Sequence, residues 1–213
     1  MAGWDMVASA RRATLGDGCK SVLLAVLFLL VAVAAPGAGR AQNLTYSEVK
    51  LGVLVHDAHF LGGKEHGADI NPEIIFQSPV SDAWAATLPP YLRWMVQPRP
   101  TIGGEINTSG YTNQAYIGAT WSWQLASNLF NPGDGIALSY FFGAGFNDGD
   151  IVATAPDRKS LGSHALFREA LEVGYRINPV YQVSVMVDHV SNGGLAKQNQ
   201  SINDIGVRLG IRF

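Results

Sequence analysis

The 213-residue chain has one cysteine, Cys19, and it lies in a segment that we expect to be removed. The basic start is followed by an apolar run over residues 21–35 and a small-residue stretch that ends at Ala41. This pattern predicts a secretory signal peptide over residues 1–41, because the apolar run is shorter than the ~20 residues of a membrane-spanning helix. The mature chain would then contain no cysteine, which excludes disulfides as its source of stability.

Charged residues are also few, and nucleotide-binding motifs are missing. Only 15% of residues are charged, and no glycine pattern of the Rossmann or P-loop type occurs. Residues 1–41 hold four of the 15 basic and two of the 17 acidic residues, which leaves 11 basic and 15 acidic residues and a net charge of −4 over residues 42–213. We therefore expect neither a nucleic-acid partner nor a cofactor. No feature of the sequence supports a homo-oligomer.

What the chain does have is a strand period of two through almost all of residues 42–213, which we predict to be one domain. In the last segment, Val207, Leu209 and Ile211 alternate with Arg208, Gly210 and Arg212. Eight such segments are predicted, over residues 48–60, 68–78, 89–107, 113–125, 135–147, 164–177, 180–191 and 202–213.

Two architectures fit alternating strands, a soluble β-sandwich and an outer-membrane β-barrel. The polar face favours the barrel, because it is rich in small residues and carries both signs of charge, as the narrow interior of an eight-stranded barrel requires. Its charged members are Asp69, Glu73, Glu105, Arg168, Glu172, Arg176, Asp188, Asp204, Arg208 and Arg212. Aromatic residues near the turns suit a membrane-interface girdle, namely Trp94, Trp121, Trp123, Tyr175 and Tyr181. We predict an all-β fold, an eight-stranded antiparallel outer-membrane barrel with a side-chain-filled interior.

The segment "VDHVSNGG" carries the candidate chemistry. His189 and Ser191 continue the odd-numbered apolar series of their strand, so both are expected on the lipid-facing wall near the outer-leaflet headgroups. Antiparallel pairing across the next hairpin brings Asn203 opposite His189. The amides of residues 192–194 follow the serine as candidate oxyanion donors. A nucleophilic site is one interpretation, and a histidine that only contacts headgroups is the other.

The stretch "HVSNGGLAKQN", the ending "GVRLGIRF" and "PRPTIGGEINTSGYTNQAYIGATW" over residues 98–121 together resemble the lipid A 3-O-deacylase (PagL-type acyloxyacyl hydrolase) family. The resemblance implies an eight-stranded barrel in the bacterial outer membrane. Its substrate would be lipid A of lipopolysaccharide, from which it would remove the ester-linked acyl chain at position 3. It also implies that His189 is the base, that Ser191 is the nucleophile, and that Asn192 and Gly194 stabilise the oxyanion. The alternative is a non-catalytic barrel that acts as an anchor or surface-binding protein.

The sequence departs from that family at one position. A glutamate usually follows the histidine by fourteen residues, whereas this chain has Asn203 there. Asp204 has the inward parity and is expected to point into the barrel. Either Asn203 orients the imidazole, or Glu169 on the neighbouring strand replaces the acid, or the protein is inactive.

Four residues near the first loop, His56, Asp57, His59 and His66, raise the question of a metal site. His56 and Asp57 are expected on opposite faces of a strand, so a polar rim is the preferred interpretation and no metal is predicted. Glu105 and the inward arginines are interpreted as an ion-pair network that fills a closed barrel.

Overall fold

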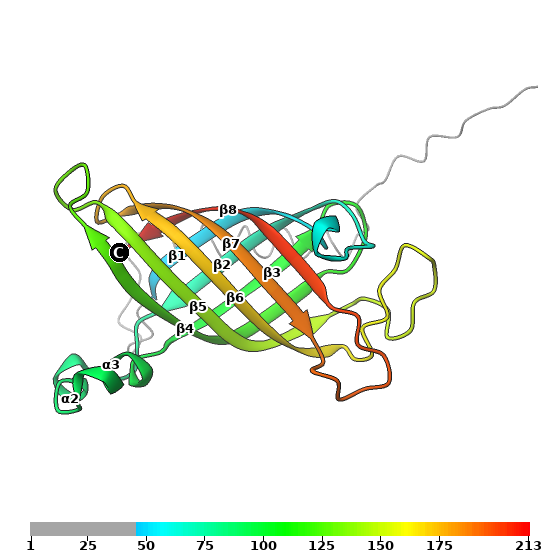
Figure 1. Cartoon of the computed structure of the whole chain (residues 1–213), viewed down its shortest axis with the longest axis horizontal. Coiled ribbons are helices and arrows are strands. Elements are labelled where there is room, and N and C mark those ends of the chain that lie inside the picture. The colour runs from blue at the N-terminus through cyan, green and yellow to red at the C-terminus, as the bar shows by residue number, and fades with distance from the viewer. Residues whose placement is uncertain (1–45) are drawn as a thin grey trace, which may run out of the picture.

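The computed structural model describes residues 46–213, which form a closed barrel of eight antiparallel strands (Figure 1). Each strand pairs with its sequence neighbours, and the last strand closes the barrel against the first. The strands are β1 Tyr46–Val55, β2 Ala68–Phe76, β3 Arg99–Asn107, β4 Gln114–Ser127, β5 Gly135–Asn147, β6 Ala165–Arg176, β7 Tyr181–Ser191 and β8 Ile202–Arg212. The predicted fold is confirmed. The predicted signal peptide lies outside the described residues.

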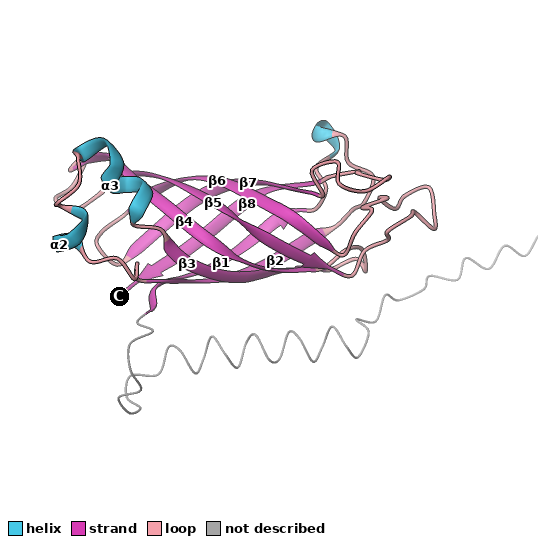
Figure 2. Cartoon of the chain, turned by 90° about the horizontal axis from the view of Figure 1, so that it is seen from below, coloured by secondary structure: helices cyan, strands magenta, loops and turns pink. Residues whose placement is uncertain are grey.

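The two ends of the barrel differ (Figure 2). One end, here called the turn end, carries both chain termini of the barrel, two short turns and the segment 77–98, which contains helices α2 (Asp82–Ala85) and α3 (Pro90–Val96). The other, the loop end, carries the loops 56–67, 108–113, 148–164 and 192–201, with one 3-10 turn, η1 (His59–Leu61). No helix among the described residues is long and apolar enough to cross a membrane.

Two predicted strand boundaries are wrong. The first half of the predicted strand 89–107 is helical, because Pro90 occupies the first turn of α3, where its missing N–H costs nothing. The predicted strand 48–60 ends at Val55, and Asp57 then adopts a left-handed backbone with φ of 44°. That conformation ends the alternation of the strand before the 3-10 turn.

Alternation places apolar side chains on the outside of the barrel and polar ones inside. In β7 the even-numbered residues are buried, whereas the odd-numbered ones face outward. Val185 on β7 is 51% exposed and Leu209 on β8 is 64% exposed. An apolar outer band on a closed barrel is the arrangement that lipid requires, since closure leaves no strand edge with unpaired backbone groups. The protein is an outer-membrane barrel.

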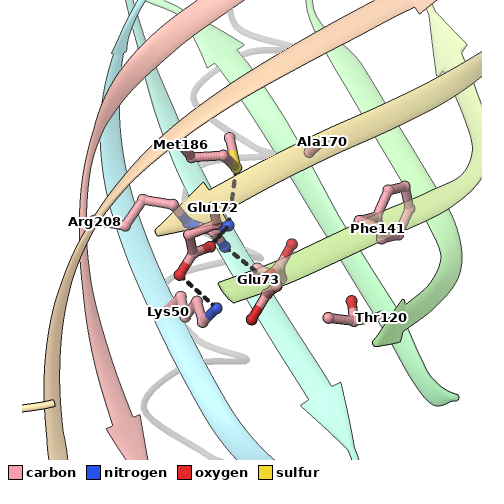
Figure 3. A pocket seen from close by; sticks show the side chains of 9 residues that line it. Lys50, Glu73, Thr120, Phe141, Ala170, Glu172, Met186 and Arg208 are labelled. Carbon is pink, nitrogen blue, oxygen red and sulfur yellow. Dashed lines mark hydrogen bonds and ion pairs between the residues drawn. The ribbon is translucent and has the colours of Figure 1, made fainter. Parts of the chain in front are cut away.

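The interior is filled by side chains that pair in charge. Near the middle, Arg208 contacts Glu73 at 2.6 Å and Glu172 at 2.8 Å, and Lys50 contacts Glu172 at 2.8 Å (Figure 3). Closer to the loop end, Arg168 contacts Glu105 at 2.7 Å and Asp188 at 2.5 Å. The predicted ion-pair network is therefore present around Arg168 and Arg208, and pairing is what makes these charges tolerable away from water.

Aromatic residues surround the turn end of the outer wall. The rings of Trp94 on α3 and Trp123 on β4 lie 5.5 Å apart, and the Trp121 indole N–H donates to the Met95 carbonyl oxygen at 3.2 Å. These contacts hold α3 against the lipid-facing side of β4. Indoles with an apolar body and one polar group favour this level of a membrane protein.

Candidate active site

Three neighbouring strands bring polar residues into one row on the outer wall at the loop end. In the register of the sheet, Glu169 on β6 lies opposite His189 on β7, which lies opposite Asn203 on β8. Ser191 is the last residue of β7 and shares the outward face with His189. His189, Ser191 and Asn203 are all half-buried, so the row is packed against its neighbours and still accessible from lipid.

A chain of hydrogen bonds joins three of these side chains. Nδ1 of His189 lies 2.7 Å from Oδ1 of Asn203, and Nε2 lies 3.1 Å from Oγ of Ser191. An amide oxygen only accepts, so Nδ1 of a neutral imidazole must carry the hydrogen, which leaves the lone pair on Nε2 to accept from the serine hydroxyl. The asparagine thus selects the tautomer in which the histidine can act as a base.

Asn203 is itself held from two sides. Its side-chain amide donates to Oγ of Ser201 at 3.2 Å, which orients the amide oxygen toward His189. Its main-chain carbonyl accepts from the N–H of Ala58 in the first loop at 2.8 Å. Ser201 has the same outward parity as Asn203, so its position two residues earlier was the available sequence signal for this contact.

The alternative acid, Glu169, lies beside His189 but contacts another residue. Its carboxylate accepts a hydrogen bond from the Tyr140 hydroxyl at 3.1 Å, on the side of the strand away from β7. Directly opposed residues of neighbouring strands have Cβ atoms about 5 Å apart. Glu169 is therefore next to the imidazole in the sheet but bonded to Tyr140, whereas Asn203 holds the ring by a hydrogen bond.

The predicted oxyanion donors are already bonded within the loop. The Asn192 side-chain amide donates to the carbonyl oxygens of Leu161 at 2.8 Å and Gln198 at 2.5 Å, and its oxygen accepts from the Gly194 N–H at 2.9 Å. Gly193 and Gly194 both adopt positive φ, at 65° and 81°. The Gly193 N–H has no acceptor among residues 46–213, which makes it the donor that remains free in this turn.

The longest loop fixes the hairpin that follows Ser191. Ser160 N–H donates to the Gln200 side chain at 2.9 Å, and Gln200 N–H donates back to the Ser160 carbonyl at 3.0 Å. Lys159, only 5% exposed, donates from Nζ to the Ser201 carbonyl at 2.9 Å and lies 3.1 Å from Asp57 Oδ1. Sequence alone gave no sign of this docking, since the loop has no period that predicts its partner.

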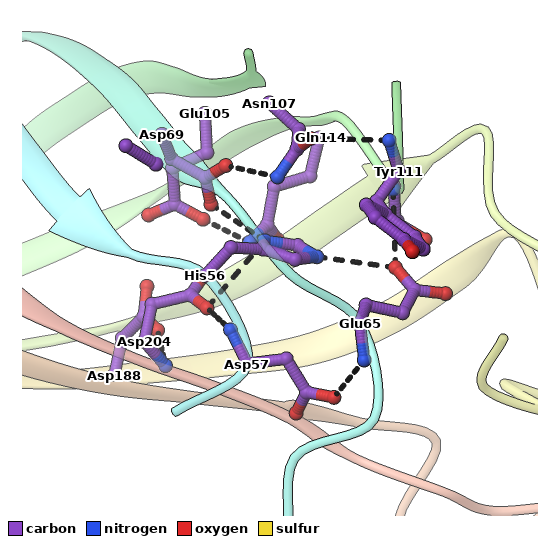
Figure 4. A network of polar contacts seen from close by, with 12 residues as sticks. His56, Asp57, Glu65, Asp69, Glu105, Asn107, Tyr111, Gln114, Asp188 and Asp204 are labelled. Carbon is purple, nitrogen blue, oxygen red and sulfur yellow. Dashed lines mark hydrogen bonds and ion pairs between the residues drawn. The ribbon is translucent and has the colours of Figure 1, made fainter. Parts of the chain in front are cut away.

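The histidines of the first loop divide into one that is buried among acidic side chains, His56 (Figure 4), and two that contact each other, His59 and His66. His56 is buried between Asp69, at 2.7 Å, and Glu65, at 3.1 Å. His59 and His66 contact each other at 3.0 Å and are exposed. The expectation that His56 and Asp57 face opposite sides is wrong, because both side chains are buried and the positive φ of Asp57 ends the alternation after His56.

The charge state of His56 follows from these contacts. Burial disfavours its charged form, but the hydrogen bonds to Asp69 and Glu65 outweigh burial and raise its pKa from 6.5 to about 10. Burial disfavours the charged form of Glu65 too, but bonds from His56 and the Lys159 and Thr112 backbones lower its pKa to about 2. His56 is thus an imidazolium that donates from both nitrogens, whereas a metal ligand must be neutral. Asp69 and Asp204 each have an oxygen within 4.8 Å of a ring nitrogen of His56.

The fold and the site together define a class, an outer-membrane β-barrel with a serine–imidazole–amide array on its lipid-facing wall. The chain belongs to the lipid A 3-O-deacylase (PagL) family. The model of that family matches residues 92–212, which is more than half of this chain.

One solved structure agrees with the fold. The crystal structure of the outer membrane enzyme PagL superposes with a TM-score of 0.58 at 14% identity, over 78% of this chain and 100% of that chain. The NanC porin aligns over 78% of this chain and 98% of its own at 12% identity, with a TM-score of 0.25 that is too low to bear on the architecture. A search of curated protein sequences found no match.

Proposed function

We propose that this protein is a serine esterase that removes the acyl chain ester-linked to position 3 of lipid A. The observation that carries the proposal is the hydrogen-bonded chain Asn203–His189–Ser191 on the outer wall of the barrel. Family membership supports the substrate, since the matching family is named for lipid A 3-O-deacylation. The location supports it as well, because a lipid ester reaches this wall without leaving the membrane.

The reaction follows from the hydrogen bonds. Ser191 Oγ attacks the carbonyl carbon of the ester while Nε2 of His189 takes the hydroxyl proton. The tetrahedral intermediate then collapses, the bond to the sugar oxygen breaks, and the imidazolium returns the proton to that oxygen. Water attacks the resulting acyl-enzyme by the same route, which releases the fatty acid and restores Ser191. Throughout, Asn203 holds the ring through Nδ1–H.

The turn at residues 192–194 supplies the groups that would stabilise the oxyanion. The Gly193 N–H is the donor without an acceptor in the described part of the chain, and the Gly194 N–H contributes by sharing its hydrogen between Asn192 and the oxyanion. The side chain of Asn192 acts here as the support of the turn, because three of its hydrogen bonds tie it to the loop backbone. Its removal would displace both glycine amides.

In this proposal two residues, Asn203 and Glu169, share the role of the third catalytic group beside Ser191 and His189. Asn203 orients the imidazole but carries no charge to stabilise the imidazolium. Glu169, in register on the other side of His189, supplies negative charge through space while bonded to Tyr140. With this division His189 is a working base, but it is a weaker base than a directly bonded carboxylate would make it.

The decisive experiment incubates the purified barrel with lipopolysaccharide and reads the lipid A by mass spectrometry. We expect loss of one 3-hydroxyacyl chain, abolished by Ser191→Ala. Ser127→Ala, an exposed serine at the turn end, is the matched control and keeps full activity. Unchanged lipid A at every pH would instead indicate a non-catalytic barrel that serves as an anchor or surface-binding protein.

A further inference from the structure

A second polar site lies at the turn end of the barrel, remote from Ser191. A cavity of about 290 Å³ opens there between the ends of the strands. Its charged wall consists of Arg99 at the start of β3, Arg176 at the end of β6, Arg212 at the end of β8, and Glu48 on β1. Ser122 and Gln182 add neutral polar groups. None of these residues takes part in the proposed deacylation.

The charges in this cavity are not balanced. Arg99 contacts Glu48 at 3.1 Å and donates to Ser122 at 2.8 Å, so it is satisfied. Within residues 46–213, the side chains of Arg176 and Arg212 make neither a hydrogen bond nor an ion pair, and Nε of Arg176 is buried without a partner. Among the side chains that line the cavity, three guanidinium groups stand against one carboxylate, which is a net side-chain charge of +2.

We propose that this cavity binds a phosphate-bearing anion. Guanidinium groups present planar pairs of N–H donors that match phosphate oxygens, and buried donors without acceptors are costly to leave unpaired. A phosphomonoester or inorganic phosphate carries a charge of about −1.5 to −2 at neutral pH, which neutralises the excess positive charge of the lining side chains. A single carboxylate would leave half of that positive charge unneutralised. The volume equals that of roughly ten waters, enough for a phosphate group with part of its hydration.

The test titrates inorganic phosphate into the full barrel in a zwitterionic detergent, at constant ionic strength and pH, by calorimetry. We expect saturable binding at one site, which chloride does not reproduce. Arg176→Gln and Arg212→Gln should each weaken binding about tenfold, since each removes hydrogen bonds to a charged ligand. Arg158→Gln at the loop end removes the same charge elsewhere and should leave the affinity unchanged.

Two further measurements complete the design. The double variant of Arg176 and Arg212 should keep wild-type activity on lipopolysaccharide, which shows that the barrel is folded and separates this site from the proposed function. In nanodiscs, phosphatidic acid but not phosphatidylcholine should abolish phosphate binding if a lipid headgroup is the natural occupant. If neither lipid competes, the source is free phosphate. Absence of saturable binding, or equal affinity in the double variant, would overturn the proposal.

Discussion

Replacing Asn203 with aspartate tests the role of this residue with the smallest possible change. The two side chains are isosteric, so Asn203→Asp keeps the 2.7 Å geometry to His189 Nδ1 and adds only a negative charge. The added carboxylate stabilises the imidazolium that forms as Ser191 loses its proton. If Asn203 orients the base in the working enzyme, Asn203→Asp should raise kcat/KM.

The size of the gain follows from the distance. With charge spread over the ring and the carboxylate, the two centres are about 4 Å apart, which gives about 4 kcal/mol at an effective dielectric constant of about 20. His189 and Asn203 are half-buried, so screening reduces the net effect to about 2 kcal/mol, or roughly 30-fold in rate. The acidic limb of the pH–rate profile should also move to higher pH, because the carboxylate favours protonated imidazole.

The assay is the initial rate of 3-hydroxyacyl release from lipopolysaccharide in mixed micelles between pH 5 and 9. Asn131→Asp, in a turn at the opposite end, controls for the change in net charge. The gel mobility of unheated protein reports that each barrel is folded. A kcat/KM within twofold of wild type, with an unmoved acidic limb, would refute the assignment of Asn203 as the group that orients His189.

Three further predictions concern neighbouring groups. Glu169→Gln should lower kcat/KM about tenfold with little change in KM, because the negative charge is lost while the geometry is kept. Unchanged deacylation would exclude a role for Glu169 in the reaction. Lys159→Met should lower the thermal midpoint and kcat by breaking the bond to the Ser201 carbonyl, and Lys159→Arg should partly restore both. The paired imidazolium of His56 has a raised pKa, so its contribution to stability is complete below pH 6.5 and is lost as pH rises through about 10. The thermal midpoint of wild type should therefore fall more steeply over this range than that of His56→Gln, and equal slopes would contradict the pKa.

Parity along the strands was enough to predict most of the barrel and the placement of the site. Because side chains alternate with a period of two, it was possible to predict from the sequence that Ser191 and His189 face outward, that Asp204 faces inward, and that Asn203 opposes His189. The same rule predicted the inward charges that pair across the interior.

Other features depend on contacts between segments that no local pattern encodes. The choice of Asn203 over Glu169 as the hydrogen-bond partner of His189 is made by side-chain rotamers and by Ser201. The docking of the longest loop on the hairpin 192–201 depends on single hydrogen bonds from Lys159 and Ser160. The α3 helix occupies the first half of a predicted strand because a ring contact and an indole hydrogen bond to β4, with a proline at its start, outweigh the alternating pattern.

The outward position of Ser191 determines how a deacylase with this site becomes saturated with its lipid substrate. A site on the lateral wall meets its substrate by diffusion in two dimensions, so the quantity that governs the rate is the mole fraction of substrate in the surrounding leaflet and not its bulk concentration. Dilution of lipopolysaccharide with inert phospholipid, at constant total substrate, should slow turnover in proportion. The composition of the membrane itself would thereby regulate the reaction, without any ligand or conformational switch.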